Sequence, residues 1–205
     1  MYFKNFLQLF QKKKAFLLAV FANLIVQLGI TYWTMMHYPV DKKNNGLLWF
    51  YIIVQFIIIF VLATVSMPSF MKFILFSAFS FIWGILFSKY RDNSFLRFAV
   101  MGTAGIFGTM FAVGILLILF GIQLGAGFGM GLFVALLFLI ISQLISIISG
   151  GYSKWLSVFG LVLFSLYIVY DTNTILQRDY LGDFIRASLD YYLDFINIFL
   201  NLSNQ

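Results

Sequence analysis

The stretch 187–202 reads ASLDYYLDFINIFLNL, and it sets four polar side chains into an apolar segment. Asp190, Asp194, Asn197 and Asn201 follow one another at intervals of four, three and four residues, which places them on one stripe of a helix. The remaining surface is Leu, Ile, Phe and Tyr. A charged aspartate at the centre of a membrane helix costs about 2.5–3.5 kcal/mol. The stripe must therefore face a partner or water inside a helix bundle.

The composition of the whole chain is that of a membrane protein. Of its 205 residues, 62% are hydrophobic and 10% are charged, and the mean hydropathy is +0.99. A soluble domain is about 45–50% apolar and about 25% charged. The absence of cysteine excludes disulfides, thiolate metal sites and cysteine nucleophiles. The net charge of +6 comes from basic residues at the ends of apolar runs, so we expect contacts with the lipid bilayer and no nucleic-acid binding.

Seven apolar segments follow one another along the chain. A bilayer core of about 30 Å needs roughly 20 helical residues. The 56 uncharged residues from 98 to 153 hold two segments, with a break at the glycine-rich GIQLGAGFGMG (121–131). The last segment would reach about 24 Å, so it barely spans or dips into the membrane. We predict an all-α polytopic membrane protein, a seven-helix bundle with a short central C-terminal helix. Its single transmembrane domain covers 1–205, with spans at about 15–36, 47–67, 69–88, 98–120, 128–149, 155–171 and 187–202.

The fourth segment carries a ladder of small residues. Ala104, Gly108 and Ala112 recur every four residues, with Gly105 and Thr109 beside them. Small residues at this spacing allow helix backbones to approach closely in lipid. We expect the ladder to pack inside the bundle, with a dimer face as the alternative.

A polar connector is expected after the sixth segment. Asp171 ends the apolar run SVFGLVLFSLYIVYD (157–171), and TNTILQRDYLGDFIR (172–186) follows. Asp179 and Asp183 lie in this connector, where a solvated loop accounts for them. The aspartates that need a special environment are therefore Asp171, at the end of a span, and Asp194, in the middle of one.

The first two segments carry polar residues of their own. Asn23, Gln27 and Thr31 are spaced four apart, and Gln55 lies in the middle of the second segment. Such side chains either line a polar pathway or form a hydrogen-bonded network that holds the bundle together. The sequence leaves both interpretations open.

The N-terminal tail predicts the orientation of the chain. Four lysines, at positions 4 and 12–14, precede the first segment, and basic residues beside a first span favour the cytoplasmic side. The first segment is longer than the apolar region of a signal peptide and is followed by no small-residue cleavage site, so we expect it to be retained.

Two motifs near the C-terminus resemble the transmembrane Bax inhibitor motif family, including its bacterial members. They are FSLYIVYDTNTI (164–175) and SLDYYLDFINIFLNL (188–202), and the seven-segment layout extends the likeness over the whole chain. The resemblance implies a seven-helix bundle whose last helix is central. It also implies a pH-sensitive calcium leak in a bacterial plasma membrane, with Asp171 and Asp194 matching the family's paired aspartates.

The chain departs from the family pattern at positions that concern gating. Bacterial relatives can carry an acid midway along the second helix and an arginine near its end, where this chain has Gln55 and VSMPS (65–69). Residues 65–69 contain no arginine that could form an ion pair with an aspartate. Asp190 is an additional acid.

The residue types suit calcium passage. Calcium takes oxygen ligands, and two carboxylates with a few amide oxygens make a weak, transient site. Two nearby carboxylates would share a proton and titrate as a pair, which couples ion flow to pH. We expect the ion pathway and pH sensor at Asp171 and Asp194, with calcium as the permeant ion and no bound cofactor. The supporting polar track comprises Asp190, Asn197, Asn201, Asn23, Gln27 and Gln55.

Three other functions stay open. A membrane scaffold would bind a protease or a stress-pathway partner without transport, and a proton-coupled carrier would use the same carboxylates. An intramembrane aspartyl protease also needs two membrane aspartates, and YD (170–171) with LGD (181–183) faintly resembles its motifs. However, Tyr180 replaces the first glycine of the expected Gly-x-Gly-Asp, and no Pro-Ala-Leu follows. We therefore expect no enzymatic activity.

Overall fold

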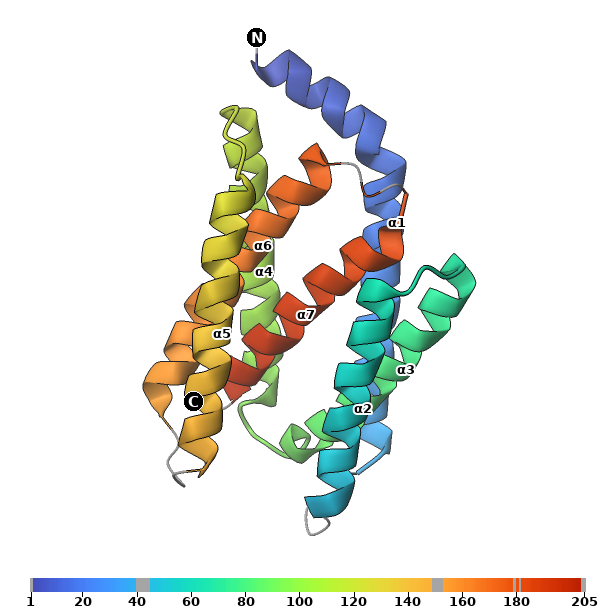
Figure 1. The fold of residues 1–205 in the computed structure, drawn as a ribbon, viewed down its shortest axis with the longest axis vertical. Helices are drawn as coiled ribbons and strands as arrows, with labels where there is room; N and C mark the ends of the chain where they lie inside the picture. Colours follow the sequence, from blue (N-terminus) through green and yellow to red (C-terminus); the bar gives the residue numbers. More distant parts are fainter. Residues whose placement is uncertain (1, 40–44, 149–152, 179, 181, 204–205) are drawn as a thin grey trace. The chain divides into compact units, whose positions relative to one another are not determined.

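The computed structural model describes residues 2–39, 45–148, 153–178, 180 and 182–203, which form helices and no strand (Figure 1). The all-α prediction is confirmed. The elements are α1 (Tyr2–His37), α2 (Asn45–Thr64), α3 (Ser69–Phe87), the short 3-10 helix η1 (Ser88–Tyr90), α4 (Leu96–Leu119), α5 (Ala126–Ile148), α6 (Lys154–Gln177) and α7 (Phe184–Ser203).

Five helical stretches are long and apolar enough to cross a membrane. They are Phe6–His37, Ser69–Tyr90, Leu96–Leu119, Ala126–Ser146 and Lys154–Gln177, and the apolar stretch Trp49–Thr64 of α2 is shorter. The helices also expose large apolar side chains, among them Phe56 and Phe60 on α2 and Phe138 on α5. Water would penalise such continuous apolar surface, whereas lipid tails cover it. The chain is therefore a polytopic membrane protein.

The helices group into two compact units. Unit 1 comprises Met1–Lys14, Arg97–Asp179 and Leu193–Gln205, and unit 2 comprises Ala15–Leu96 and Tyr180–Tyr192. The division falls within α1 and within α7. Asp190 therefore belongs to unit 2, whereas Asp194 belongs to unit 1 together with Asp171.

Glycines bring the helices of unit 1 close together. α5 packs along α6. A Cβ atom on Gly114 of α4 would lie 2.7 Å from the Cβ of Thr172 on α6, and one on Gly160 of α6 would lie 2.7 Å from the Oδ1 of Asn201 on α7. Only a residue without a side chain permits these approaches, so α4 and α7 pack closely on α6 at the two glycines.

The ladder of small residues on α4 does not pack inside the bundle, and this prediction is wrong. Ala104, Gly108 and Ala112 are exposed, and no described atom lies within 4 Å of a Cβ built on Gly108. The buried positions of α4 are Ala99, Thr103, Gly114 and Ile118. Of these, Thr103 directly precedes the ladder residue Ala104, and one residue corresponds to a rotation of about 100° around the helix.

The predicted break between the fourth and fifth segments is confirmed. Gly121 has a φ of 75°, and its N–H donates to the carbonyl of Ile118 over 2.9 Å. The N–H of Ile122 donates to the carbonyl of Leu117 over 2.9 Å. This pair of bonds is a Schellman motif, and it ends α4 at a residue for which the left-handed conformation carries no steric penalty.

α6 is longer than predicted, and the expected connector is helical in its first part. The helix continues six residues beyond Asp171 to Gln177. The side chain of Asn173 explains the difference, because it donates to the carbonyl of Ile122 (3.0 Å) and accepts from the N–H of Leu124 (2.9 Å). The polar residues after Asp171 are thus buried against the α4–α5 connection and not solvated in a loop.

Unit 2 is built on α3, which packs along α2 and against α1. The N–H groups of Met71 and Lys72 donate to the carbonyl of Pro68, so α3 begins directly after the proline, as predicted. A Cβ on Gly84 of α3 would lie 2.6 Å from the carbonyl oxygen of Thr31 on α1. This glycine brings α1 and α3 into backbone contact.

α7 is longer than the sequence predicted, and most of it is buried or half-buried. Its 20 residues correspond to about 30 Å, which matches the hydrocarbon core of a bilayer. None of the residues from Ala187 to Ser203 is exposed. The last helix is therefore shielded from lipid, as its polar stripe requires.

The contrast between Gly114 and Gly108 gives a test of the packing of α4. We expect Gly114→Leu to destabilise the protein by about 1–3 kcal/mol or more, because the added side chain collides with Thr172. The matched variant Gly108→Leu should retain the parent stability, because its surroundings are open. Thermal unfolding in detergent measures both, and equal losses would contradict this assignment of the buried face.

Candidate functional site

Asp171 lies inside α6, on the same face as a tyrosine. The prediction that it closes the end of the sixth helix is wrong, since α6 extends to Gln177. Tyr167 precedes Asp171 by four residues, and side chains at this spacing lie one above the other on a helix. The phenol of Tyr167 and the carboxylate of Asp171 therefore lie on one face of α6.

Asp194 on α7 approaches the same tyrosine. The residue is only 3% exposed. The Tyr167 hydroxyl interacts electrostatically with the carboxylates of both Asp194 and Asp171. Two aspartates that are 23 residues apart in sequence thus both influence one phenol inside unit 1. A phenol can donate a hydrogen bond to one carboxylate, and its oxygen can accept a hydrogen bond from the other when that carboxyl group is protonated.

Two asparagines continue the polar stripe along α7. The side-chain amide of Asn197 donates to the carbonyl of Leu193 over 2.8 Å, and that of Asn201 donates to the carbonyl of Asn197 over 2.7 Å. Both amide nitrogens are held by the backbone of the same helix. The amide oxygens are therefore the atoms that can meet a cation, and the oxygen of Asn201 faces Gly160 of α6.

The ligand set at this place is small. No group of three or more His, Cys, Asp or Glu residues that could hold a metal ion occurs in the described part of the chain. A calcium ion near Asp171 and Asp194 would thus be bound by two carboxylates and by neutral oxygens. Calcium sites that retain the ion use six to eight oxygen ligands, so this arrangement favours passage over storage.

Asp190 has a different partner. Its carboxylate accepts a hydrogen bond of 3.2 Å from the hydroxyl of Tyr180, and the residue is half-buried in unit 2. The additional acid is therefore held by the segment that leads into α7. It lies one helical turn before Asp194 on the same stripe.

The polar stripe of α1 is the centre of a hydrogen-bonded network in unit 2. Gln27 is fully buried, and its amide nitrogen donates to Asn23 (3.3 Å) and to Ser77 of α3 (3.2 Å). Its amide oxygen accepts from the hydroxyl of Ser80 over 2.9 Å. The side chain thus has partners for both its nitrogen and its oxygen.

The same stripe contacts the first half of α7. Asn23 donates to the hydroxyl of Ser188 over 2.5 Å, and the hydroxyls of Thr31 and Tyr192 are 2.6 Å apart. Mutually satisfied groups of this kind hold helices in a fixed register. For Asn23 and Gln27 the contacts favour the network interpretation; a role in an ion pathway stays a prediction.

Gln55 joins α2 to α3. Its amide nitrogen donates to the backbone carbonyl of Phe79 over 3.0 Å, and the residue is buried. The side chain thus forms a hydrogen bond to a neighbouring helix. Its place in the predicted ion track also remains a prediction.

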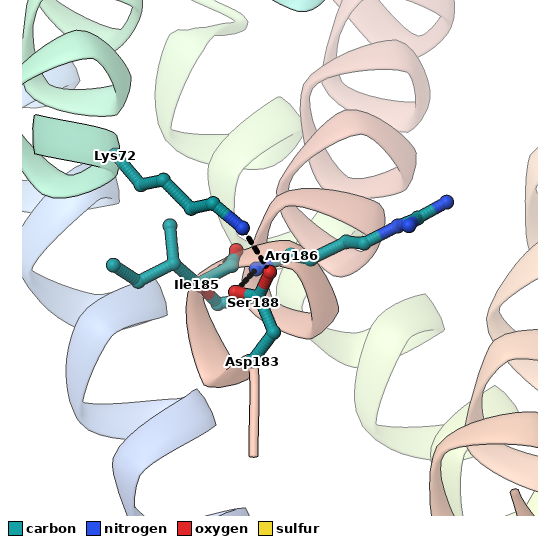
Figure 2. Close-up of polar contacts among 5 residues, drawn as sticks. All are labelled: Lys72, Asp183, Ile185, Arg186 and Ser188. Carbon is teal, nitrogen blue, oxygen red and sulfur yellow. Dashed lines mark hydrogen bonds and ion pairs between the residues drawn. The ribbon is translucent and has the colours of Figure 1, made fainter. Parts of the chain in front are cut away.

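Asp183 is not a solvated connector residue, and this prediction is wrong. Its carboxylate pairs with the ammonium group of Lys72 on α3, and the two side chains are only 17% and 22% exposed. The same carboxylate caps α7, since its Oδ1 accepts from the N–H of Arg186 over 3.0 Å. Figure 2 shows Lys72 reaching to Asp183, whereas the Arg186 side chain points away from both. The cation of α3 fixes the start of α7.

Sequence reasoning missed Tyr167, Lys72 and the serines of the network. Tyr167 had a usable signal, because it precedes Asp171 by one turn. Lys72 is the single cation between 69 and 88, which also marks it. Ser77, Ser80 and Ser188 had none, because isolated serines are common in membrane helices and their partners come from distant segments.

The fold and the aspartate site define a class, the polytopic membrane proteins with seven helices and a buried polar last helix. Within it, the family described as "Inhibitor of apoptosis-promoting Bax1" matches residues 13–204. The chain belongs to this Bax inhibitor-like family.

Individual relatives come from bacteria and from viruses. An uncharacterised protein of Helicobacter pylori strain J99 is 30% identical over 148 residues, which cover 58% of this chain and 64% of the relative. The Golgi anti-apoptotic protein of vaccinia virus strain Lister is 40% identical over 76 residues, covering 36% of this chain and 32% of the relative. The chain thus spans less than two thirds of the length of these relatives.

The two roles of Asp183 can be separated by a pair of variants. We expect Asp183→Asn to lose the ion pair with Lys72 but to keep the helix cap, because asparagine caps as well as aspartate. Asp183→Ala should lose both and be less stable than Asp183→Asn by about 0.5–2 kcal/mol. Thermal unfolding in detergent measures the difference.

The background Lys72→Gln supplies the control for this pair. There the ion pair is already absent, so Asp183→Asn should change the stability little, whereas Asp183→Ala should still remove the cap. A full effect of Asp183→Asn in the Lys72→Gln background would contradict the ion pair.

Proposed function

We propose that the protein is a pH-sensitive calcium leak channel, with Asp171 and Asp194 as ion pathway and pH sensor. The observation that supports it is that both aspartates act electrostatically on the phenol of Tyr167 within unit 1, from two different helices. A carboxylate in a membrane helix is costly, so it faces a polar partner or a water-filled cavity and often marks a functional site. The proposal involves no enzymatic step and no resident cofactor.

The proposed pathway uses oxygen atoms throughout. A calcium ion would exchange water for the carboxylates of Asp171 and Asp194 and for the amide oxygens of Asn197 and Asn201. Asp190 would extend this track by one turn in the other direction. Because the ligands are few, each ion would bind weakly enough to leave again.

The proposed pH response follows from the charge of the pair. Two carboxylates at close range do not both ionise readily, so they share a proton and titrate together. Protonation removes the charge that attracts the cation, and it also provides a hydrogen bond that holds the two helices together. The charged and titratable groups at this place are Asp171, Asp194, Tyr167 and Tyr170.

We further propose a bacterial plasma membrane and a cytoplasmic N-terminus. Bacterial relatives support the first and the lysines before the first span support the second. Calcium ions, protons and lipid are the expected partners.

A membrane scaffold is the second candidate. Over 76 residues the chain is similar to a viral protein described as anti-apoptotic, a role that need not involve transport. A scaffold would bind a membrane-protein partner and carry no calcium.

Calcium flux in sealed liposomes tests the proposal. We expect the purified protein to release calcium at a rate that changes across roughly pH 5–8. Asp194→Asn and Asp171→Asn keep the side-chain size but remove the titrating group, so each should abolish the pH dependence and alter the leak.

The matched control is Asp92→Asn, which removes an acid whose side chain is 85% exposed. It should behave as the parent does. Absence of calcium flux at every pH, or unchanged behaviour of both site variants, would overturn the leak and favour the scaffold. Potassium and proton dyes in the same liposomes separate a calcium path from a proton-coupled carrier.

Single cysteines test the orientation, because the chain has none of its own. Gln11 and Asp92 are both exposed, and the apolar part of α1, α2 and α3 lie between them in the chain. We expect a membrane-impermeant maleimide to label Asp92→Cys in intact cells and Gln11→Cys only after permeabilisation. Labelling of Gln11→Cys in intact cells would reverse the topology.

A further inference from the structure

Arg186 extends the polar stripe of α7 by one turn. It precedes Asp190 by four residues, and side chains at this spacing are neighbours on one face of a helix. Arg186 is exposed, whereas none of the residues from Ala187 to Ser203 is. The arginine therefore stands at the boundary between the shielded part of α7 and its surroundings.

The charges of unit 2 around the start of α7 are matched in pairs. Lys72 forms the ion pair with Asp183, and Figure 2 shows the Arg186 side chain pointing away from both. The carboxylate of Asp190 interacts electrostatically with the guanidinium group of Arg186 and with the carboxylate of Asp183. Because Lys72 already compensates Asp183, the positive charge that acts on Asp190 is that of Arg186.

The second partner of Asp190 is neutral. The hydroxyl of Tyr180 donates to one of its carboxylate oxygens over 3.2 Å, and the ring of Tyr180 lies against Phe16 of α1 with centroids 6.2 Å apart. This phenol holds the carboxylate in place but adds no positive charge. The strength with which Asp190 attracts a metal cation thus depends on Arg186.

We propose that Arg186 limits the entry of calcium at the start of α7, because its charge opposes the attraction that Asp190 exerts on the ion. The inference rests on the proposed leak, in which Asp190 extends the track of oxygen ligands. A fixed positive charge beside an ion path repels incoming cations. Since the repulsion is proportional to the charge of the ion, Arg186 acts on calcium twice as strongly in energy as on potassium. It therefore also lowers the preference of the path for divalent ions.

Calcium and potassium flux in sealed liposomes tests this role of Arg186. We expect Arg186→Gln to raise the calcium flux on the order of tenfold at low ionic strength. The potassium flux should rise only about threefold, because half the energy corresponds to the square root of the ratio. Arg186→Glu should raise the calcium flux further. Both increases should shrink when choline chloride is added, because Arg186 is exposed and salt screens exposed charges.

Two further variants show whether the charge acts at this place. Asp190→Asn removes the opposing charge and should lower the calcium flux, so the double variant with Arg186→Gln should lie between the two single variants. Arg97→Gln removes the same charge from an exposed position of α4 and should leave both fluxes as in the parent.

The outcomes separate this inference from the leak itself. A parent leak that Arg186→Gln leaves unchanged, or that it raises equally for calcium and potassium, would overturn the role of Arg186 while the leak stands. The same increase in Arg97→Gln would also overturn it. Absence of calcium flux in the parent would overturn both.

Discussion

Polar side chains inside a lipid bilayer cannot obtain hydrogen bonds from water, and the arrangement of the helices follows from this constraint. α7 carries two carboxylates and two carboxamides on one stripe, so it must be covered by protein. None of its residues from Ala187 to Ser203 is exposed. Apolar side chains have no such need and can face lipid. α5, for example, exposes large apolar side chains such as Phe138.

The two units satisfy their polar groups in different ways. In unit 2, Gln27 bonds Asn23, Ser77 and Ser80, so neutral donors and acceptors are matched among themselves. In unit 1, the carboxylates of Asp171 and Asp194 both act electrostatically on the phenol of Tyr167, and the proposed pH response depends on their charge. A matched neutral network has little reason to change with pH, whereas a pair of acids does. This difference separates the structural framework from the proposed site.

Glycine determines where helices meet closely. Gly114 and Gly160 lie against side chains of α6 and α7 that belong to or adjoin the polar stripe. Close approach brings backbone carbonyls and short polar side chains within hydrogen-bonding distance, which lipid cannot offer. Gly114 and Gly160 thus pack beside polar residues, whereas the more regular ladder at Gly108 remains exposed.

Composition and periodicity alone determined the class of protein, the helices and the stripe on α7, because apolar length and spacing are local properties of the chain. The aspartates were also visible, since an acid in an apolar run is costly wherever its partner lies. The length of α6, the pairing of Lys72 with Asp183 and the outward side of the α4 ladder were decided only by the tertiary structure. Each depends on which residue of a distant helix stands opposite, and a periodic pattern gives the face of a helix but not its neighbour.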